Sequence, residues 1–236
     1  MTRELPEWYY DEFIQTGTDY SDKEEIHRYD RKMQKIRNIK DEAETMRRLI
    51  DLQAGDRVLE IGCGTGEFSI ELSRHCKEVI AVDISDGMLE FAREKAKSRH
   101  RKNIRFIKGG FLTFEPGDEP FDAVVTQLAL HHLPDFWKLI ALKRINSMLK
   151  VSSRFYLRDV IYSSEISDFD PFFSKLLQSI PEEVKDEMTH EYILHIKEEF
   201  STFDWVIEEL IEKAGFRIEE AFYDNGFIAT YLCIKK

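Results

Sequence analysis

Apolar and polar positions alternate in short blocks along most of the chain, and the blocks switch between a strand-like and a helix-like period. The runs with the length and composition of strands are Val58–Ile61, Val79–Ile84, Ile104–Lys108, Phe121–Gln127 and Ser153–Val160. Between them, apolar residues recur every three or four positions, as in the helix that Ser85 is placed to cap. Strands interleaved with helices of this length predict a parallel sheet covered on both faces.

The end of the chain departs from this rhythm. A helical stripe over residues 203–214 stops at Gly215, and two strand-like runs follow, Phe216–Tyr223 and Phe227–Ile234. Asn225-Gly226 lies between them and favours a type I′ hairpin turn, because both positions accept positive φ. The predicted fold class is therefore α/β: a Rossmann-like sheet of five parallel strands plus a C-terminal antiparallel hairpin, with helices on both faces.

The first fifty residues precede the first strand and are predicted to be helical. Aromatic residues before about residue 17 predict a short docking helix, and Ser21 with Glu24 has the pattern of a capping box. A second helical segment lies between Ile161 and Thr202, at the sheet edge where ligand-contacting segments gather. We therefore divide the chain into an N-terminal helical cap, residues 1–50, and a main domain, residues 51–236, with a substrate-side insertion at about 161–202.

Composition narrows the class of partner. Apolar residues make up 42% and charged residues 33% of the 236, which is ordinary for a globular domain, and the formal charge is −11. An acidic surface repels phosphate backbones, so no nucleic-acid partner is expected. The three cysteines have no CxxC spacing, the N-terminus is too polar for a signal peptide, and no apolar run has membrane length. These features predict a cytoplasmic protein with reduced thiols and no membrane partner.

A glycine-rich loop follows the first predicted strand directly. Gly62, Gly64 and Gly66 form G-x-G-x-G, whereas a dinucleotide loop of the G-x-G-x-x-G type needs glycine where this chain has Glu67. A Walker lysine is also missing. Glu60 places a carboxylate beside the loop, which suits an ammonium or sulfonium group better than a pyrophosphate.

The segment Glu60–Gly66 resembles the first motif of class I S-adenosylmethionine-dependent methyltransferases, and the likeness runs from about residue 40 to the C-terminus. The resemblance implies S-adenosylmethionine as cofactor, with Asp83 binding both ribose hydroxyls and Ile84 and Met88 enclosing adenine. Gln127 falls where the family contacts the amino-acid end of the cofactor. The cofactor-binding residues implied here are Glu60, Gly62, Cys63, Gly64, Gly66, Asp83, Ile84, Met88 and Gln127.

The chain departs from the family pattern after the third strand. The family usually has Gly-Asp there, and its carboxylate accepts a hydrogen bond from the adenine amine, but this chain reads Gly109-Gly110-Phe111. We expect backbone groups of Gly110 and Phe111 to contact adenine instead. In the N-terminal segment, Tyr29 and Arg37 resemble elements that fold over the cofactor, where Arg37 would meet its carboxylate; a solvated charge is the alternative for Arg37.

His131 and His132 follow the fourth strand and are the candidate catalytic residues. A neutral imidazole there would take a proton from an acceptor hydroxyl or amine, while a pocket-wall or helix-capping role is the alternative. Arg158-Asp159 ends the fifth strand near the expected substrate mouth, and a surface ion pair is the simpler interpretation of these two residues.

The resemblance implies methyl transfer by direct displacement, and several features favour a small-molecule acceptor. Residues 126–134 lack the Asn/Asp-Pro-Pro-aromatic element of enzymes that methylate nucleic-acid bases. No acid cluster is similar to the metal site of catechol-type enzymes, so metal independence is expected. One alternative is a non-catalytic S-adenosylmethionine-binding protein that acts through a partner. The other, a nicotinamide-dependent oxidoreductase, is disfavoured by Glu60 and Glu67. The sequence predicts neither the acceptor nor the oligomeric state.

Overall fold

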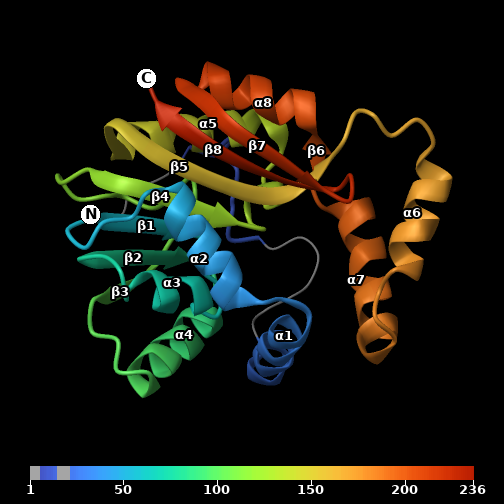
Figure 1. The fold of residues 1–236 in the computed structure, drawn as a ribbon, viewed down its shortest axis with the longest axis horizontal. Helices are drawn as coiled ribbons and strands as arrows, with labels where there is room; N and C mark the ends of the chain where they lie inside the picture. Colours follow the sequence, from blue (N-terminus) through green and yellow to red (C-terminus); the bar gives the residue numbers. More distant parts are fainter. Residues whose placement is uncertain (1–5, 15–21) are drawn as a thin grey trace.

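A mixed β-sheet forms the centre of the molecule in the computed structural model, which describes residues 6–14 and 22–236 (Figure 1). Its strand order is β3-β2-β1-β4-β5-β8-β7, and the short β6 pairs with the end of β5. The strands are β1 (Arg57–Ile61), β2 (Glu78–Asp83), β3 (Ile104–Lys108), β4 (Phe121–Gln127), β5 (Leu149–Tyr162), β6 (Thr202–Phe203), β7 (Phe216–Asp224) and β8 (Ile228–Lys235). The first five are parallel, and β8 is antiparallel to both β5 and β7. The predicted fold class is confirmed.

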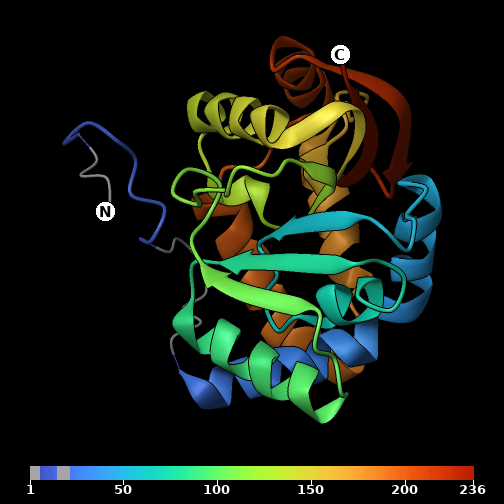
Figure 2. The same ribbon diagram turned by 90° about the vertical axis from the view of Figure 1, so that its left-hand side faces the viewer.

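Helices cover both faces of the sheet (Figure 2). Those packed around the sheet are α1 (Lys23–Ile36), α2 (Ile39–Leu49), α3 (Glu67–Leu72), α4 (Asp86–Ser98), α5 (Asp135–Met148) and α8 (Asp204–Lys213). The insertion after β5 contributes α6 (Phe169–Gln178), the short 3₁₀ turn η2 (Glu182–Val184) and α7 (Lys185–Glu198). A further 3₁₀ turn, η1 (Leu130–His132), follows β4. In Figure 1, α6 and α7 stand beside the sheet at the ends of β5 and β8.

Alternation along the strands produces two apolar cores. Leu59 and Ile61 of β1 pack in the core that contains residues of α5 and α8, whereas Val58 packs with residues of α2 and α3 on the other face. Glu60 follows the same alternation and therefore lies on the α3 side. A carboxylate is thereby placed inside the second core, next to the loop that leaves β1.

The strand order reverses between β1 and β4, and this reversal positions the site. From β1 the chain runs outward to β2 and β3, then crosses back to β4 and continues to β5. Loops leaving the carboxyl ends of β1 and β4 therefore diverge to opposite faces and leave a crevice between them. The glycine loop and η1 are these two loops.

The N-terminal part differs from the prediction in two places. Residues 6–14 form turns, not a helix, because they dock through individual side chains, such as Tyr9 edge-on to Trp137 at 4.8 Å between ring centroids. The first helix begins at Lys23 with Asp22 as N-cap, whose carboxylate accepts from two backbone N–H groups of the first turn. Ser21, the predicted cap, lies outside the described residues, as do residues 1–5 and 15–20.

The described part of the chain contains no helix suited to crossing a bilayer. Its longest helices, such as α1, α5 and α7, have 14 residues. About 20 apolar residues are needed to span the hydrocarbon core.

Gly66, between β1 and α3, is predicted to stabilise the fold. It has φ of 76°, and a Cβ there would lie 2.8 Å from the Cβ of Ala92 in α4. We expect Gly66→Ala to lower the free energy of unfolding by about 2–4 kcal/mol, since the left-handed backbone and the overlap both carry a cost. Urea unfolding followed by circular dichroism measures this change.

Gly55→Ala is the matched control. A Cβ at Gly55 meets nothing within 4 Å, so its midpoint of unfolding is expected to stay close to that of the unaltered protein. Equal midpoints for the two variants would show that the packing of α3 against α4 tolerates the extra methyl group.

Candidate functional site

A cavity of about 330 Å³ opens at the carboxyl ends of β1, β2 and β4. Its volume is within the range of small-molecule sites. The residues predicted to bind a cofactor lie in its wall, apart from Gly66: Tyr29, Arg37, Glu60, Gly62, Cys63, Gly64, Asp83, Ile84, Met88, Gly110, Phe111 and Gln127. His131 and His132 line the same cavity. Gly66 packs against α4 instead, so its role is in the turn.

The glycine loop is shaped by backbone conformation and close packing. Gly62 and Gly64 have φ of 78° and 50°, a region that side chains disfavour. A Cβ at Gly62 would meet the Cβ of Ala129 at 2.4 Å, so glycine is needed for the approach of the loop after β4. Around Gly64 there is open space, and its N–H donates to a carboxylate oxygen of Asp83 at 2.8 Å.

Asp83 is oriented by the backbone on both sides of it. One oxygen accepts from Gly64 N–H, and the other accepts from Ser85 N–H at 2.9 Å. Ser85 in turn caps α4 by accepting from Met88 N–H at 3.2 Å. Burial raises the pKa of Asp83, and these backbone hydrogen bonds oppose the increase. Each carboxylate oxygen keeps a lone pair for a ligand in the cavity.

Glu60 is the most strongly perturbed carboxyl group at the loop. Burial, and then the charge of Asp83, raise its pKa to about 8, although the hydroxyl of Ser69 in α3 donates to it. At neutral pH this carboxyl group is therefore mostly protonated. A cation placed beside it would favour the ionised form.

Gln127, at the end of β4, lies in the cavity wall and carries an amide donor. Its carbonyl oxygen accepts from the guanidinium of Arg37 at 2.9 Å, and Arg37 also pairs with Glu42. The amide nitrogen is buried and has no hydrogen-bond partner among the described residues. A buried donor without a partner is costly, so this nitrogen fits an anionic group such as the carboxylate of an amino acid.

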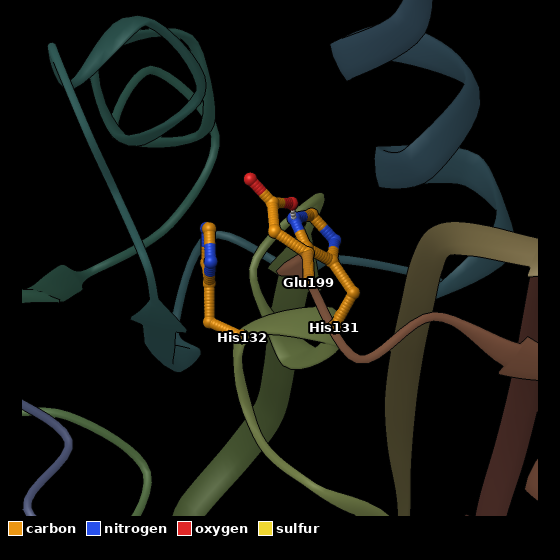
Figure 3. A group of neighbouring side chains, drawn as sticks. All are labelled: His131, His132 and Glu199. Atoms are coloured by element: carbon orange, nitrogen blue, oxygen red, sulfur yellow. Dashed lines mark ion pairs between the residues drawn. The ribbon is translucent and has the colours of Figure 1, made fainter. Parts of the chain in front are cut away.

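His131 lies between two carboxylates on the other side of the cavity. Its Nδ1 contacts Asp159 of β5. Its Nε2 lies 3.1 Å from Glu199, which follows α7, and Figure 3 shows this pair with His132 beside it. The backbone reinforces the arrangement, since His131 N–H donates to Asp159 at 3.0 Å and Phe200 N–H donates to His131 C=O at 2.9 Å. His132 stands next to it with its ring centroid 4.3 Å away.

The two histidines have opposite protonation states. Burial alone would lower the pKa of His131, but Asp159 and Glu199 outweigh it and raise the pKa to about 9. Burial and the charge of His131 lower the pKa of His132 to about 4. The same imidazolium holds the pKa values of Asp159 and Glu199 below their usual ranges, despite burial. At pH 7 His131 is charged, whereas His132 is a neutral imidazole.

The insertion completes this side of the cavity. His195 of α7 contacts Glu199 through Nδ1 and lies 2.7 Å from the Ser201 hydroxyl through Nε2. Most of the rest of this wall is apolar or aromatic, namely Leu176, Tyr162, Tyr192 and Phe227; Glu191, which pairs with Lys32, is charged. A mostly apolar pocket whose charged groups are paired suits a small acceptor that has a polar group at one end.

Ligand atoms of His131, His132 and Glu199 lie within 4.8 Å of one another, a spacing compatible with a metal ion among the described residues. Both ring nitrogens of His131 already contact carboxylates, so an ion would have to displace Glu199 from Nε2. Metal independence remains a prediction.

Several residues of this cluster were missed or misread from the sequence. Asp159 was interpreted as half of a surface ion pair with Arg158, but it is 2% exposed and its partner is His131. Glu199 was missed because it meets His131 68 residues away, across the whole insertion. His195 contacts Glu199 and Ser201 nearby, but the sequence gives no sign that this pair reaches His131. Glu12, which also lines the cavity, gave only one weak signal, an acid among aromatic residues.

Comparisons with known proteins agree with this geometry. A family model described as "Methyltransferase domain" matches residues 58–152. A demethylmenaquinone methyltransferase of Lactococcus lactis is 32% identical over 206 residues, which cover 82% of this chain and 78% of the relative. A second one, of Staphylococcus haemolyticus, is 29% identical over 203 residues, covering 78% and 79%.

A solved structure gives the same fold. An S-adenosylmethionine-dependent methyltransferase of Clostridium acetobutylicum superposes with a TM-score of 0.67 at 15% identity, over 90% of this chain and 98% of that one. Together with the sheet order, the glycine loop and the relatives at this level of identity, these comparisons show that the chain belongs to the class I S-adenosylmethionine-dependent methyltransferases.

Proposed function

We propose that this methyltransferase transfers a methyl group from S-adenosylmethionine to a small aromatic acceptor that bears an ionisable hydroxyl group. The observation that carries the proposal is one cavity with two chemically different ends. One end has the glycine loop, Asp83 and the Gln127 amide, and the other has the His131 imidazolium and apolar walls. The relatives named demethylmenaquinone methyltransferases support a quinone-derived ring as one member of this acceptor class.

The residues at the cofactor end have separate roles in this proposal. Asp83, held by Gly64 and Ser85, accepts from the two ribose hydroxyls. The buried amide nitrogen of Gln127 donates to the carboxylate of the methionine part, with Arg37 orienting the amide through its carbonyl oxygen. Glu60 supplies negative charge beside the loop. S-adenosylmethionine itself supplies an electrophilic methyl group on a positively charged sulfur.

At the acceptor end, the two histidines have different roles in the deprotonation of the acceptor. The neutral His132 accepts the proton of the acceptor hydroxyl, and His131 acts on the resulting oxyanion through its positive charge, since Asp159 and Glu199 already occupy both of its ring nitrogens. A pKa of about 4 makes His132 a weak base; burial is the main cause, and the charge of His131 adds to it. An oxyanion formed beside the ring offsets the second of these causes. Asp159 and Glu199 hold the imidazolium in place.

We extend the proposal to the organisation and location of the protein. Residues 51–236 form the methyltransferase domain, residues 1–50 cap the cofactor end, and the insertion at about 161–202 forms the acceptor side. The presence of Tyr29, Arg37 and His195 in the cavity wall supports this division. Three free, buried cysteines support a reducing, cytoplasmic location, and the charge of −11 supports a small acceptor rather than a nucleic acid.

An activity assay tests the acceptor class. The protein is incubated with S-adenosylmethionine and three sets of acceptors: a chemically reduced short-chain demethylmenaquinone, simple phenols and primary amines. We expect formation of S-adenosylhomocysteine and a methylated product with hydroxylated rings. Turnover confined to amines would contradict the acceptor class, and cofactor binding without turnover of any acceptor would favour a non-catalytic binding protein.

The role of Asp83 is tested by cofactor affinity. Asp83→Ala removes the acceptor of both ribose hydroxyls, so we expect the Kd for S-adenosylhomocysteine to rise on the order of 100-fold in calorimetric titration. Asp86→Ala is the control, because Asp86 lies three residues away, is exposed and pairs with Lys108. An Asp83 variant with the affinity of the Asp86 variant would refute the assignment.

Glu60 makes cofactor binding depend on pH. Its pKa of about 8 means that a cationic ligand must displace a proton at pH 7, so affinity for S-adenosylmethionine should rise with pH and level off above about pH 8. Titration in buffers of different ionisation enthalpy should detect the release of close to one proton per bound ligand at pH 7. Glu60→Gln should abolish this release; if release persists in that variant, another group is the source.

His131 is expected to set the alkaline limit of activity. Because its raised pKa is about 9, the stabilising charge is present below that pH and is lost as the pH rises through it, so kcat/KM should fall above about pH 9. His131→Gln should lower kcat/KM by about 100- to 1000-fold and remove this alkaline limb. His190→Gln, an exposed change on the same insertion helix as His195, should leave the profile unchanged.

A further inference from the structure

Glu12 is buried in the cavity wall although it belongs to the N-terminal segment. Residues 6–14 pack on α5 through Tyr9 and Trp137, and they bring Glu12 to the turn after β3. Its side chain is 6% exposed. One carboxylate oxygen, Oε1, accepts from Leu112 N–H at 3.0 Å, Thr113 N–H at 2.8 Å and the Thr113 hydroxyl at 2.6 Å.

The second carboxylate oxygen has a different environment. Oε2 lies 3.1 Å from the same Leu112 N–H and has no other hydrogen-bond partner among the described residues. It lies against Gly110, where an added Cβ would be 2.4 Å away. The carboxylate of Glu12 therefore occupies the space into which a side chain at position 110 would project. The end of β3 lacks a side chain there, and a distant segment fills the place with an acid.

Glu12 lines the same cavity as several apolar residues, and we call this part of the cavity the slot. Ile84 and Met88 line one part of the cavity, Phe111 and Gly110 line another, and Asp83 lies at the end of the neighbouring strand. A purine base has apolar faces, and its edge carries the groups that form hydrogen bonds. An ionised carboxylate only accepts, so it favours an edge with an N–H donor and disfavours an edge with a carbonyl oxygen.

We propose that Glu12 accepts a hydrogen bond from the exocyclic amine of the cofactor's adenine and gives the cavity its preference for a 6-amino purine over a 6-oxo purine. The inference rests on the proposed cofactor end of the site, since Asp83 must hold the ribose for the base to reach this slot. Glu12 thereby makes the N-terminal segment part of the cofactor-binding site. The same side chain therefore holds residues 6–14 against the turn after β3 and contacts the adenine base.

The test compares two nucleosides that differ at one position. S-adenosylhomocysteine and S-inosylhomocysteine, in which oxygen replaces the exocyclic amine, are titrated into the full-length protein by calorimetry. We expect the unaltered protein to bind the adenosyl compound about 10- to 100-fold more tightly, as for a hydrogen bond to a charged group. Glu12→Gln should reduce this ratio to within a few-fold, because an amide can turn its N–H₂ group toward the 6-oxo position.

Glu7→Gln is the matched control, as the same chemical change at an exposed position of the same segment. It should keep the full ratio of the two affinities. A purely structural role for Glu12 would weaken both nucleosides equally, so the ratio, and not the affinity, decides the question.

A rescue experiment moves the acid from the segment to the strand end. In Glu12→Ala the space beside Gly110 is vacated, and Gly110→Asp in that background places a carboxylate close to its original position. We expect the double variant to recover most of the preference for adenine that Glu12→Ala loses. Gly110→Asp alone brings two carboxylates into overlap and should lower the melting temperature more than the double variant does.

Three results would overturn the inference while leaving the rest of the site intact. The first is an unchanged ratio in Glu12→Gln, with or without an equal loss for both nucleosides; the second is an unchanged ratio in Glu12→Ala; the third is tighter binding of S-adenosylhomocysteine by Glu12→Ala, which would mean that Glu12 blocks the slot. By contrast, failure of the unaltered protein to bind S-adenosylhomocysteine at all would refute the proposed cofactor end itself. Binding by the unaltered protein therefore tests the cofactor end of the site, and the variants test the role of Glu12.

Discussion

Burying several carboxylates around one cavity is the physical constraint on which the rest of this structure depends. A buried carboxylate must find donors or give up its charge. Asp83 and Glu12 are stabilised by backbone N–H groups of turns, Glu199 by the imidazolium of His131, and Glu60 by a raised pKa. Three of these four carboxylates also hold a loop in place: Asp83 holds the glycine loop, Glu12 the turn after β3, and Glu199 the end of the insertion. The cavity that results is acidic, which suits a cationic cofactor.

The sequence was most informative where structure and chemistry are local. The glycine loop, the strand before it and Asp83 at the end of the next strand follow from residue type and short spacing, and their elements appear where predicted. Parallel pairing of β1 and β2 then aligns the carboxyl ends of the two strands. Two neighbouring strand ends are enough to bring Asp83 within 2.8 Å of Gly64 N–H, without any information from distant segments.

The acceptor end was less predictable because its contacts are long-range. His131 meets Asp159 across 28 residues and Glu199 across a whole inserted segment, so neither pairing leaves a pattern in the sequence. The interpretation of Asp159 as a surface ion pair failed because it considered only the adjacent Arg158, whereas successive residues of a strand point to opposite faces. The N-terminal segment failed as a helix for a related reason. Its aromatic residues were correctly read as docking residues, but Trp137 and the turn after β3 hold it without helical hydrogen bonds.

The elements that form the two ends of the cavity also differ in how much apolar surface they bury. The cofactor end is part of the sheet, whose strands have nearly continuous burial. No residue of α6, all of which are described, is buried, and only Met188 of α7 is. The insertion is held by a small cluster of Ile180, Val184 and Met188, and by ion pairs from Lys32 of α1. An element with so little buried apolar surface opens at a lower free-energy cost than the sheet does.

Because Glu199 belongs to this element, opening the insertion would both expose the acceptor pocket and remove one carboxylate from His131. Closure over an acceptor would bring Glu199 back to His131, where it adds to the effect of Asp159 and raises the pKa of the imidazole further.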